Sequence, residues 1–130
     1  MNSSLALLPS SARLLHTADS THVYGHVLRR AFDCSYPPAI IESDLIHVDF
    51  DVREVRANGL YLVEAVKPGA SRLVEWRGCR RFDLRPGGLH MDVSGSGEWI
   101  PAALDAWHMR IAGMVIDVYR SSRAKGATHG

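Results

Sequence analysis

The seven histidines are the residues best suited to bind a metal ion or to move a proton near neutral pH. His22 and His26 stand four residues apart, a spacing that on a helix would place both imidazoles on one face. No glutamate lies between them as in an HExxH pattern, and no third ligand follows at a suitable spacing. His47, His90 and His108 fall on separate expected strands, and nothing in the sequence brings them together. We therefore expect surface or partly buried histidines and no metal site.

The two cysteines, Cys34 and Cys79, are too few for a disulfide scaffold and fit a reducing compartment. They form no CxxC pair, so the sequence predicts no zinc site. We expect no cofactor.

The fifteen basic residues include only two lysines, Lys67 and Lys125; the rest are arginines. Because a guanidinium keeps its proton at any workable pH, chemistry that needs a neutral amine has almost no candidates in this chain.

Five arginines gather in a short stretch that we expect to form two strands: Arg72, Arg77, Arg80, Arg81 and Arg85. They could form a phosphate-binding patch. However, acidic residues are interspersed among them, the formal net charge of the chain is only +1, and no aromatic RNA-binding signature accompanies them. We therefore favour a solvated β surface, with direct nucleic-acid binding as the weaker alternative.

The elements that must position these side chains are mostly strands. The chain has 130 residues, 46% hydrophobic and 22% charged, which suits one globular domain. Apolar, β-branched runs between Gly and Pro turns predict strands at 44–50, 60–66, 72–76, 80–84, 89–93 and 108–119. Gly113 suggests a bulge or bend in the last run. Residues 102–107 could form one helical turn, and the signal over 23–32 is ambiguous.

We predict a mainly β, antiparallel single domain over residues 21–120, with a short N-terminal arm at 1–20 and a flexible tail at 121–130. No run approaches the ~20 apolar residues of a membrane helix, and the start of the chain lacks the charge of a secretory leader. We expect a cytoplasmic protein without membrane contact.

The segment from Ser35 to Asp44 has the most specific pattern, Ser-Tyr-Pro-Pro-Ala-Ile-Ile-Glu-Ser-Asp. Its two prolines fix the backbone after Ser35, so the serine hydroxyl could be held in one place. Without a neighbouring base to take its proton, such a serine is only a turn residue, and the residues alone identify no such base.

This segment resembles the LexA/UmuD-type and phage-repressor C-terminal serine peptidases, whose motif is S-M-x-P-T-I-x-x-G-D. The sequence matches the motif at Ser35, Pro38, Ile40 and Asp44, and departs from it at Tyr36, Ala39 and Ser43. Residues 58–64 are similar to the central strand of that family and residues 110–120 to its closing strand. The resemblance covers roughly residues 21 to 120 and implies the same β-rich peptidase-like fold.

In that family a serine attacks a peptide carbonyl while a buried, neutral lysine takes its proton. The resemblance places Ser35 at the nucleophile position and Ser71 at the position of the missing lysine. Lys67, at the tip of a predicted hairpin, is a poor substitute base. The only Ala-Gly bond, Ala112–Gly113, lies within the last expected strand and not upstream of the serine.

The resemblance therefore implies a catalytically silent relative, closer in layout to UmuD because too few residues precede the domain for a helix-turn-helix. Such a protein would form a homodimer and contact a regulatory partner of repressor or polymerase type, in phage or SOS-type regulation. We expect pairing surfaces at strand edges near residues 108–119. The alternative is an active self-cleaving serine peptidase that uses Ser35 with Lys67 or a histidine.

Overall fold

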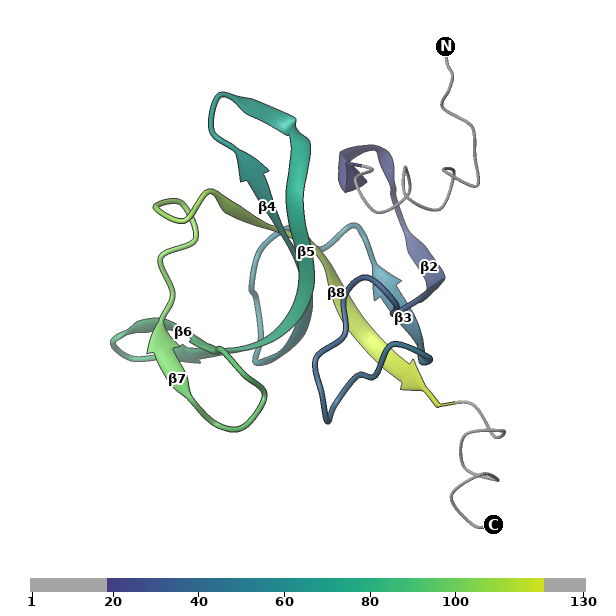
Figure 1. Cartoon of the computed structure of the whole chain (residues 1–130). Coiled ribbons are helices and arrows are strands. Elements are labelled where there is room, and N and C mark those ends of the chain that lie inside the picture. The colour runs from purple at the N-terminus through teal and green to yellow at the C-terminus, as the bar shows by residue number, and fades with distance from the viewer. Residues whose placement is uncertain (1–18, 121–130) are drawn as a thin grey trace.

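A computed structural model describes residues 19–120, which form one seven-stranded sheet in which every neighbouring pair is antiparallel (Figure 1). A 3-10 turn, η1 (Ser20–His22), is followed by β2 (His26–Arg30), β3 (Leu45–Asp49), β4 (Gly59–Lys67), β5 (Ala70–Arg85), β6 (Gly88–Asp92), β7 (Trp99–Pro101) and β8 (Met109–Tyr119). The strand order is β2-β3-β8-β4-β5-β6-β7. The predicted mainly β class is confirmed. The arm up to residue 18 and the tail from residue 121 lie outside the described residues.

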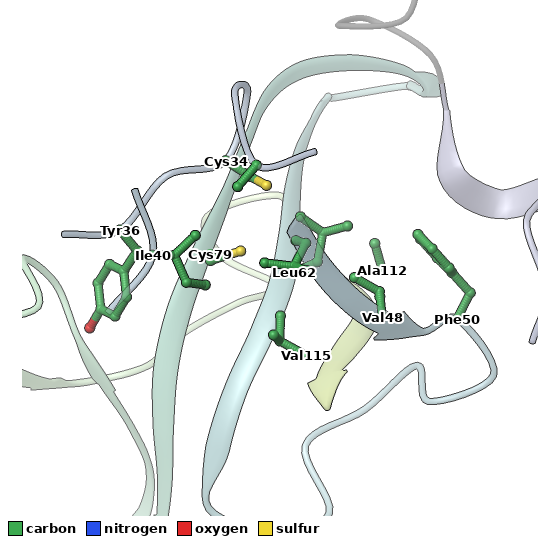
Figure 2. Packing of buried hydrophobic residues seen from close by; sticks show 11 residues of the cluster. Cys34, Tyr36, Ile40, Val48, Phe50, Leu62, Cys79, Ala112 and Val115 are labelled. Carbon is green, nitrogen blue, oxygen red and sulfur yellow. The ribbon is translucent and has the colours of Figure 1, made fainter. Parts of the chain in front are cut away.

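β4 is buried from Tyr61 to Glu64 because both faces of the sheet are covered there. Leu62 packs into what we call the turn-side core, which also receives Cys34, Tyr36 and Ile40 (Figure 2). Its neighbours Tyr61 and Val63 point to the other face, into the opposite core. The two cores account for an almost continuously apolar strand that alternation alone would not explain.

β5 corrects one prediction, because the expected strands at 72–76 and 80–84 are a single strand of 16 residues. The residues between them, Arg77 to Cys79, are buried and pair with Glu64, Val63 and Leu62 of β4. A central, buried arginine interrupts the apolar pattern, and the sequence therefore suggests a break that the backbone does not make. The sequence pattern also did not predict the short strand β7.

β8 corrects a second prediction, because it lies inside the sheet between β3 and β4. β4 pairs with its residues 109–115 and β3 with its residues 114–119, so each edge is occupied over about half of the strand. The edge strands of the described sheet are β2 and β7.

Three further predictions concern the bulge at Gly113, a helical turn at 102–107 and helices that could cross a membrane. The register of β4 against β8 shifts between Gly113 and Ile111, which confirms a bulge beside Gly113. Residues 104–108 form hydrogen-bonded turns but no assigned helix. No helix in residues 19–120 has the length and apolar character needed to cross a membrane.

Gly113 is needed where β8 passes β3. A Cβ built on Gly113 would lie 2.6 Å from Val48 Cγ1 and 2.9 Å from the Asp49 carbonyl oxygen. We predict that Gly113→Ala lowers the free energy of unfolding by about 1–3 kcal/mol, as expected for overpacking in a core. Urea unfolding followed by circular dichroism measures this loss.

The matched control is Gly87→Ala, in the β5–β6 turn, where an added Cβ meets no atom within 4 Å and φ is not positive. It should change the stability by less than about 1 kcal/mol. Equal effects of the two substitutions would show that β8 does not approach β3 as described.

Candidate functional site

The segment after β2 forms a closed turn that we call the serine turn, residues 33–40. Tyr36 N donates to the Ile40 carbonyl at 2.7 Å, and Ile40 N donates back to the Tyr36 carbonyl at 2.9 Å. These two bonds enclose Pro37 and Pro38, whose peptide bond is cis. Ser35 is half-buried immediately before this closed loop, between the buried side chains of Cys34 and Tyr36. The expectation that prolines restrain the backbone after the serine agrees with this geometry.

Asp44 holds the end of the same segment. Its buried carboxylate accepts the Ile41 amide at 2.9 Å and two bonds from Arg120, at 3.0 and 3.1 Å. The hydrogen bonds from Arg120 hold the pKa of Asp44 below its ordinary value. Arg120 follows β8, so Asp44 ties the serine turn to the end of the central strand.

Tyr36 holds the turn on its other side. Its hydroxyl donates to the backbone carbonyl of Asp92 at 2.8 Å. The Asp92 carboxylate in turn accepts the amides of Gly95, Gly97 and Glu98, which organises the loop after β6. This loop lies against the prolines, since a Cβ on Gly95 would come within 2.5 Å of the Pro37 carbonyl oxygen. The serine turn therefore rests on fixed backbone.

The strand beside the serine turn is the central part of β5. Arg77 donates to Asp33 at 3.1 Å, and the Arg80 guanidinium lies 5.4 Å from the centre of the Tyr36 ring. Cys34 and Cys79 meet in the turn-side core, although they are 45 positions apart in the sequence (Figure 2). The hydrogen bond with Cys34, followed by burial, holds the pKa of the Cys79 thiol well above its ordinary value. The β5 residues that adjoin the turn are thus Arg77 to Arg81.

Ser71 and Lys67 lie elsewhere, at the far end of the β4–β5 hairpin. Lys67 is exposed and pairs with Ala70 beside the turn of the hairpin. Ser71 is exposed, and its carbonyl accepts Arg110 at 2.8 Å. Six positions of β5 separate Ser71 from Arg77, which is roughly 20 Å of extended strand. Neither residue is brought to Ser35.

Arginines are the basic groups that contact the serine turn. Arg29 binds both oxygens of Asp33, at 2.8 and 2.9 Å, and its guanidinium lies 3.6 Å from Cys34 Sγ. An arginine cannot accept the proton of a serine hydroxyl, because its guanidinium remains protonated. The hydrogen bonds found in residues 19–120 include none from the Ser35 side chain and none from a lysine or histidine to residues 33–36. The described contacts therefore supply Ser35 with no general base.

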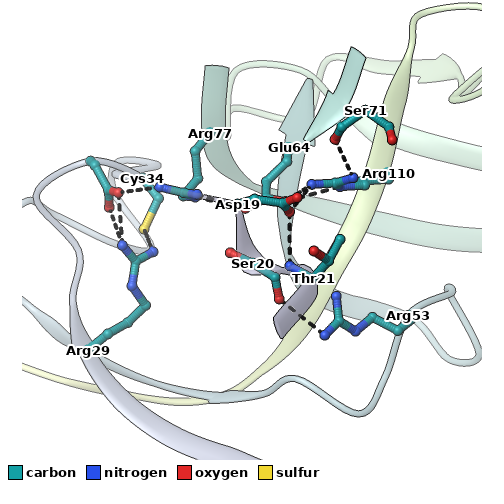
Figure 3. A network of polar contacts seen from close by, with 11 residues as sticks. Asp19, Ser20, Thr21, Arg29, Cys34, Arg53, Glu64, Ser71, Arg77 and Arg110 are labelled. Atoms are coloured by element: carbon teal, nitrogen blue, oxygen red, sulfur yellow. Dashed lines mark hydrogen bonds and ion pairs between the residues drawn. The ribbon is translucent and has the colours of Figure 1, made fainter. Parts of the chain in front are cut away.

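Behind the serine turn lies a chain of buried and partly buried ion pairs that we call the carboxylate–arginine network (Figure 3). At its centre the fully buried Glu64 accepts Arg77 at 2.8 and 3.1 Å through one oxygen and Arg110 at 3.1 Å through the other. Arg77 continues to Asp33 and from there to Arg29, whereas Arg110 continues to Asp19. Three carboxylates alternate with three arginines, so the network is formally neutral.

The charges in this network stabilise one another. Burial alone would raise the pKa of Asp33, but Arg29 and Arg77 outweigh it and hold the pKa below its ordinary value. Burial likewise opposes the charge of Arg77, but Glu64 and Asp33 raise its pKa. Sequence analysis missed the network. Its one signal is Glu64, a carboxylate in the middle of an otherwise apolar strand.

The histidines separate into different contacts. His22 lies against Arg72, whereas His26 Nδ1 is 2.8 Å from His47 Nε2 and His26 Nε2 is 3.5 Å from Asp49. No pattern in the sequence indicated that His26 of β2 and His47 of β3 would meet; they lie diagonally across the two strands. Within residues 19–120 no group of three or more His, Cys, Asp or Glu side chains is arranged to bind a metal ion.

The arginines of β5 do not form one cationic patch. Arg77 is buried in the network, Arg80 stacks over Trp76 at 4.9 Å, and Arg85 lies over Trp99 at 4.9 Å. Their charges are thus distributed among ion pairs and aromatic rings on both faces of the sheet. Whether the chain binds nucleic acid stays a prediction.

Comparison of the chain with protein families, curated proteins and solved structures gives no match.

Breaking the centre of the network should destabilise the fold strongly. We predict that Glu64→Gln costs about 3–5 kcal/mol, because it leaves the buried Arg77 and the partly buried Arg110 short of a counter-charge. The double variant Glu64→Gln with Arg77→Met should cost at least about 1 kcal/mol less than the sum of the two single losses. Urea denaturation of the four proteins in this cycle measures the coupling.

The partly exposed pair of Asp83 and Arg85, 3.6 Å apart, provides the control. Asp83→Asn should cost less than about 1 kcal/mol. A loss of that size for Glu64→Gln as well would contradict a buried, charged Glu64.

Proposed function

We propose that this chain acts through protein–protein contact and not as a peptidase, as a catalytically silent relative of the LexA/UmuD type. It forms a homodimer through its sheet and contacts a regulatory protein of repressor or polymerase type. The observation that carries the proposal is a row of exposed apolar side chains on the outer face of β2, β3 and β8.

The register places this row on one face. Leu45 pairs directly with Tyr119 of β8, and Leu28 pairs with His47, two positions along β3 from Leu45. Cross-strand partners and residues two apart on a strand share a face, so Leu45 adjoins Tyr119 and lies diagonal to Leu28. The same face carries Arg30, His47 and Asp117. Their exposed fractions are 60%, 40% and 48%. Contiguous apolar side chains in this degree of exposure are typical of interaction surfaces.

The row reaches an edge of the sheet. Among residues 19–120, β2 pairs only with β3, so its other backbone edge could pair with a second copy of the same strand. Antiparallel pairing about a two-fold axis at Leu28 would place this leucine against its own copy, as a closed dimer requires. The apolar row and the free edge therefore favour the same β2-centred contact.

We predict that the full chain is a dimer at micromolar concentration and that Leu28→Asp makes it a monomer, because the substitution places a charge in the contact. Sedimentation velocity measures both states. Leu73→Asp is the matched control, since Leu73 is 48% exposed on the β4–β5 hairpin, away from the row. A wild-type monomer throughout the micromolar range, or equal dissociation by the two substitutions, would refute the β2-centred dimer.

The alternative function is self-cleavage by Ser35, which the rigid serine turn favours. Against it stands the chemistry of the groups beside the turn, which are arginines and not amines or imidazoles. We expect the wild-type chain and Ser35→Ala to remain equally intact during long incubation at mildly alkaline pH, followed by mass spectrometry. A fragment that forms from the wild-type chain but not from Ser35→Ala would establish the peptidase.

A further inference from the structure

Two histidines, His26 and His47, meet on one face of β2 and β3, the pair of strands at one edge of the described sheet (Figure 1). His26 Nδ1 lies 2.8 Å from His47 Nε2, and the two ring centres are 4.9 Å apart. Neither imidazole belongs to the carboxylate–arginine network or to the serine turn. The pair is thus a cluster of nitrogen donors to which the proposed function gives no role.

The pairing of the strands fixes the relative position of the two side chains. His26 is opposite Asp49 and Leu28 is opposite His47, so the histidines are diagonal neighbours on the same face. Both donors stand on paired strands and not on loops, and donors on such elements are held more precisely.

Asp49 orients the His26 ring. Its Oδ1 accepts the Asp51 amide at 3.0 Å, and its Oδ2 lies 3.5 Å from His26 Nε2. A negative charge beside Nε2 favours the tautomer that carries its proton there, which leaves a lone pair on Nδ1. A carboxylate that faces the second ring nitrogen is the usual arrangement around histidines that bind a metal ion.

The separation of the two nitrogens selects the kind of ion. With metal–nitrogen bonds of about 2.0 Å, two nitrogens at a right angle are about 2.8 Å apart, whereas two at a tetrahedral angle are about 3.3 Å apart. The distance between His26 Nδ1 and His47 Nε2 agrees with the right angle. Copper(II) prefers a square arrangement of nitrogen and oxygen ligands, and it binds such donors more tightly than the other divalent first-row ions.

A hydrated ion can reach the pair from solvent. The His26 side chain is 59% exposed, and His47 is half-buried. Rotation of the exposed His26 ring directs both lone pairs to one point, with His47 as its Nδ1–H tautomer. Within the described part of the chain no third His, Cys, Asp or Glu side chain is arranged to complete the site, so water fills the other positions of the ion.

We propose that His26 Nδ1 and His47 Nε2 bind one copper(II) ion in neighbouring positions of a square arrangement, with water as the remaining ligands. The ion replaces the hydrogen bond between the two rings and joins the edge strand β2 to β3. The sequence spacing paired His26 with His22 and gave no metal site, but His22 lies against Arg72. Both donors of the proposed site come from one chain, so the site does not depend on the proposed dimer.

The probe is Cu²⁺, titrated into the full chain and followed by calorimetry and electron paramagnetic resonance. The wild-type chain should bind one ion in its tightest, saturable class, with a resonance split by two nitrogens. His26→Gln and His47→Gln should each weaken this binding at least about tenfold, because a single remaining histidine binds without the chelate. Both side chains are at least partly exposed, so their loss leaves the two cores intact.

His90→Gln is the matched control. His90 is half-buried like His47 but lies on β6, where its Nδ1 is 3.2 Å from the Gly88 carbonyl oxygen. This substitution should leave the dissociation constant unchanged. Cu²⁺ should also raise the midpoint of thermal unfolding more in the wild type and in His90→Gln than in the two pair variants, since the chelate exists only in the folded chain.

Three results would overturn the proposal: no saturable binding of one ion per chain, unchanged binding by folded His26→Gln or His47→Gln, or an equal loss in His90→Gln. Circular dichroism checks that each variant is folded, and if His47→Gln is not, the more exposed His26→Gln decides. The dimer test is carried out without metal, and one ion per chain is expected for monomer and dimer alike. The two proposals can therefore fail separately.

Discussion

The buried carboxylate of Glu64, paired with two arginines, is the interaction around which the interior is arranged. A carboxylate taken out of water is costly unless opposite charges and hydrogen bonds replace its hydration. Here Arg77 of β5 and Arg110 of β8 supply these bonds from the two strands that flank β4. Each of these arginines also pairs with a second carboxylate: Arg77 with Asp33, and Arg110 with Asp19. One buried charge thus ties three central strands to the serine turn and to the start of the described chain.

The same constraint explains why the serine turn is held so firmly. Asp33 opens the turn and belongs to the network, whereas Asp44 closes the segment through Arg120. Tyr36 secures the middle through the Asp92 carbonyl. The hydrogen bonds and ion pairs of Asp33, Asp44 and Tyr36 do not involve the Ser35 hydroxyl. Neighbouring arginines lower the pKa of Asp33 and of Asp44, so both carboxylates stay ionised at neutral pH and hold the turn.

Local pattern predicted much of the fold. The strands at 44–50, 60–66, 89–93 and 108–119 correspond to β3, β4, β6 and β8, because each lies in an apolar, β-branched run. The pattern failed at β5, where Arg77 is buried only because Glu64 faces it across the sheet. It also failed for the position of β8, since order within a sheet depends on pairing between distant segments. The Pro37–Pro38 restraint after Ser35 was predictable because it is local, whereas the contact of Cys34 with Cys79 depends on the fold.

The identity of the basic residues connects the sequence and the site most directly. A lysine buried near Ser35 would lose its proton easily, because burial disfavours its charged form. An arginine in the same surroundings keeps its proton and needs permanent counter-charges, which are the carboxylates that the network contains. The arginines beside the serine turn are therefore held by ion pairs to carboxylates, and the described contacts bring no neutral amine to Ser35.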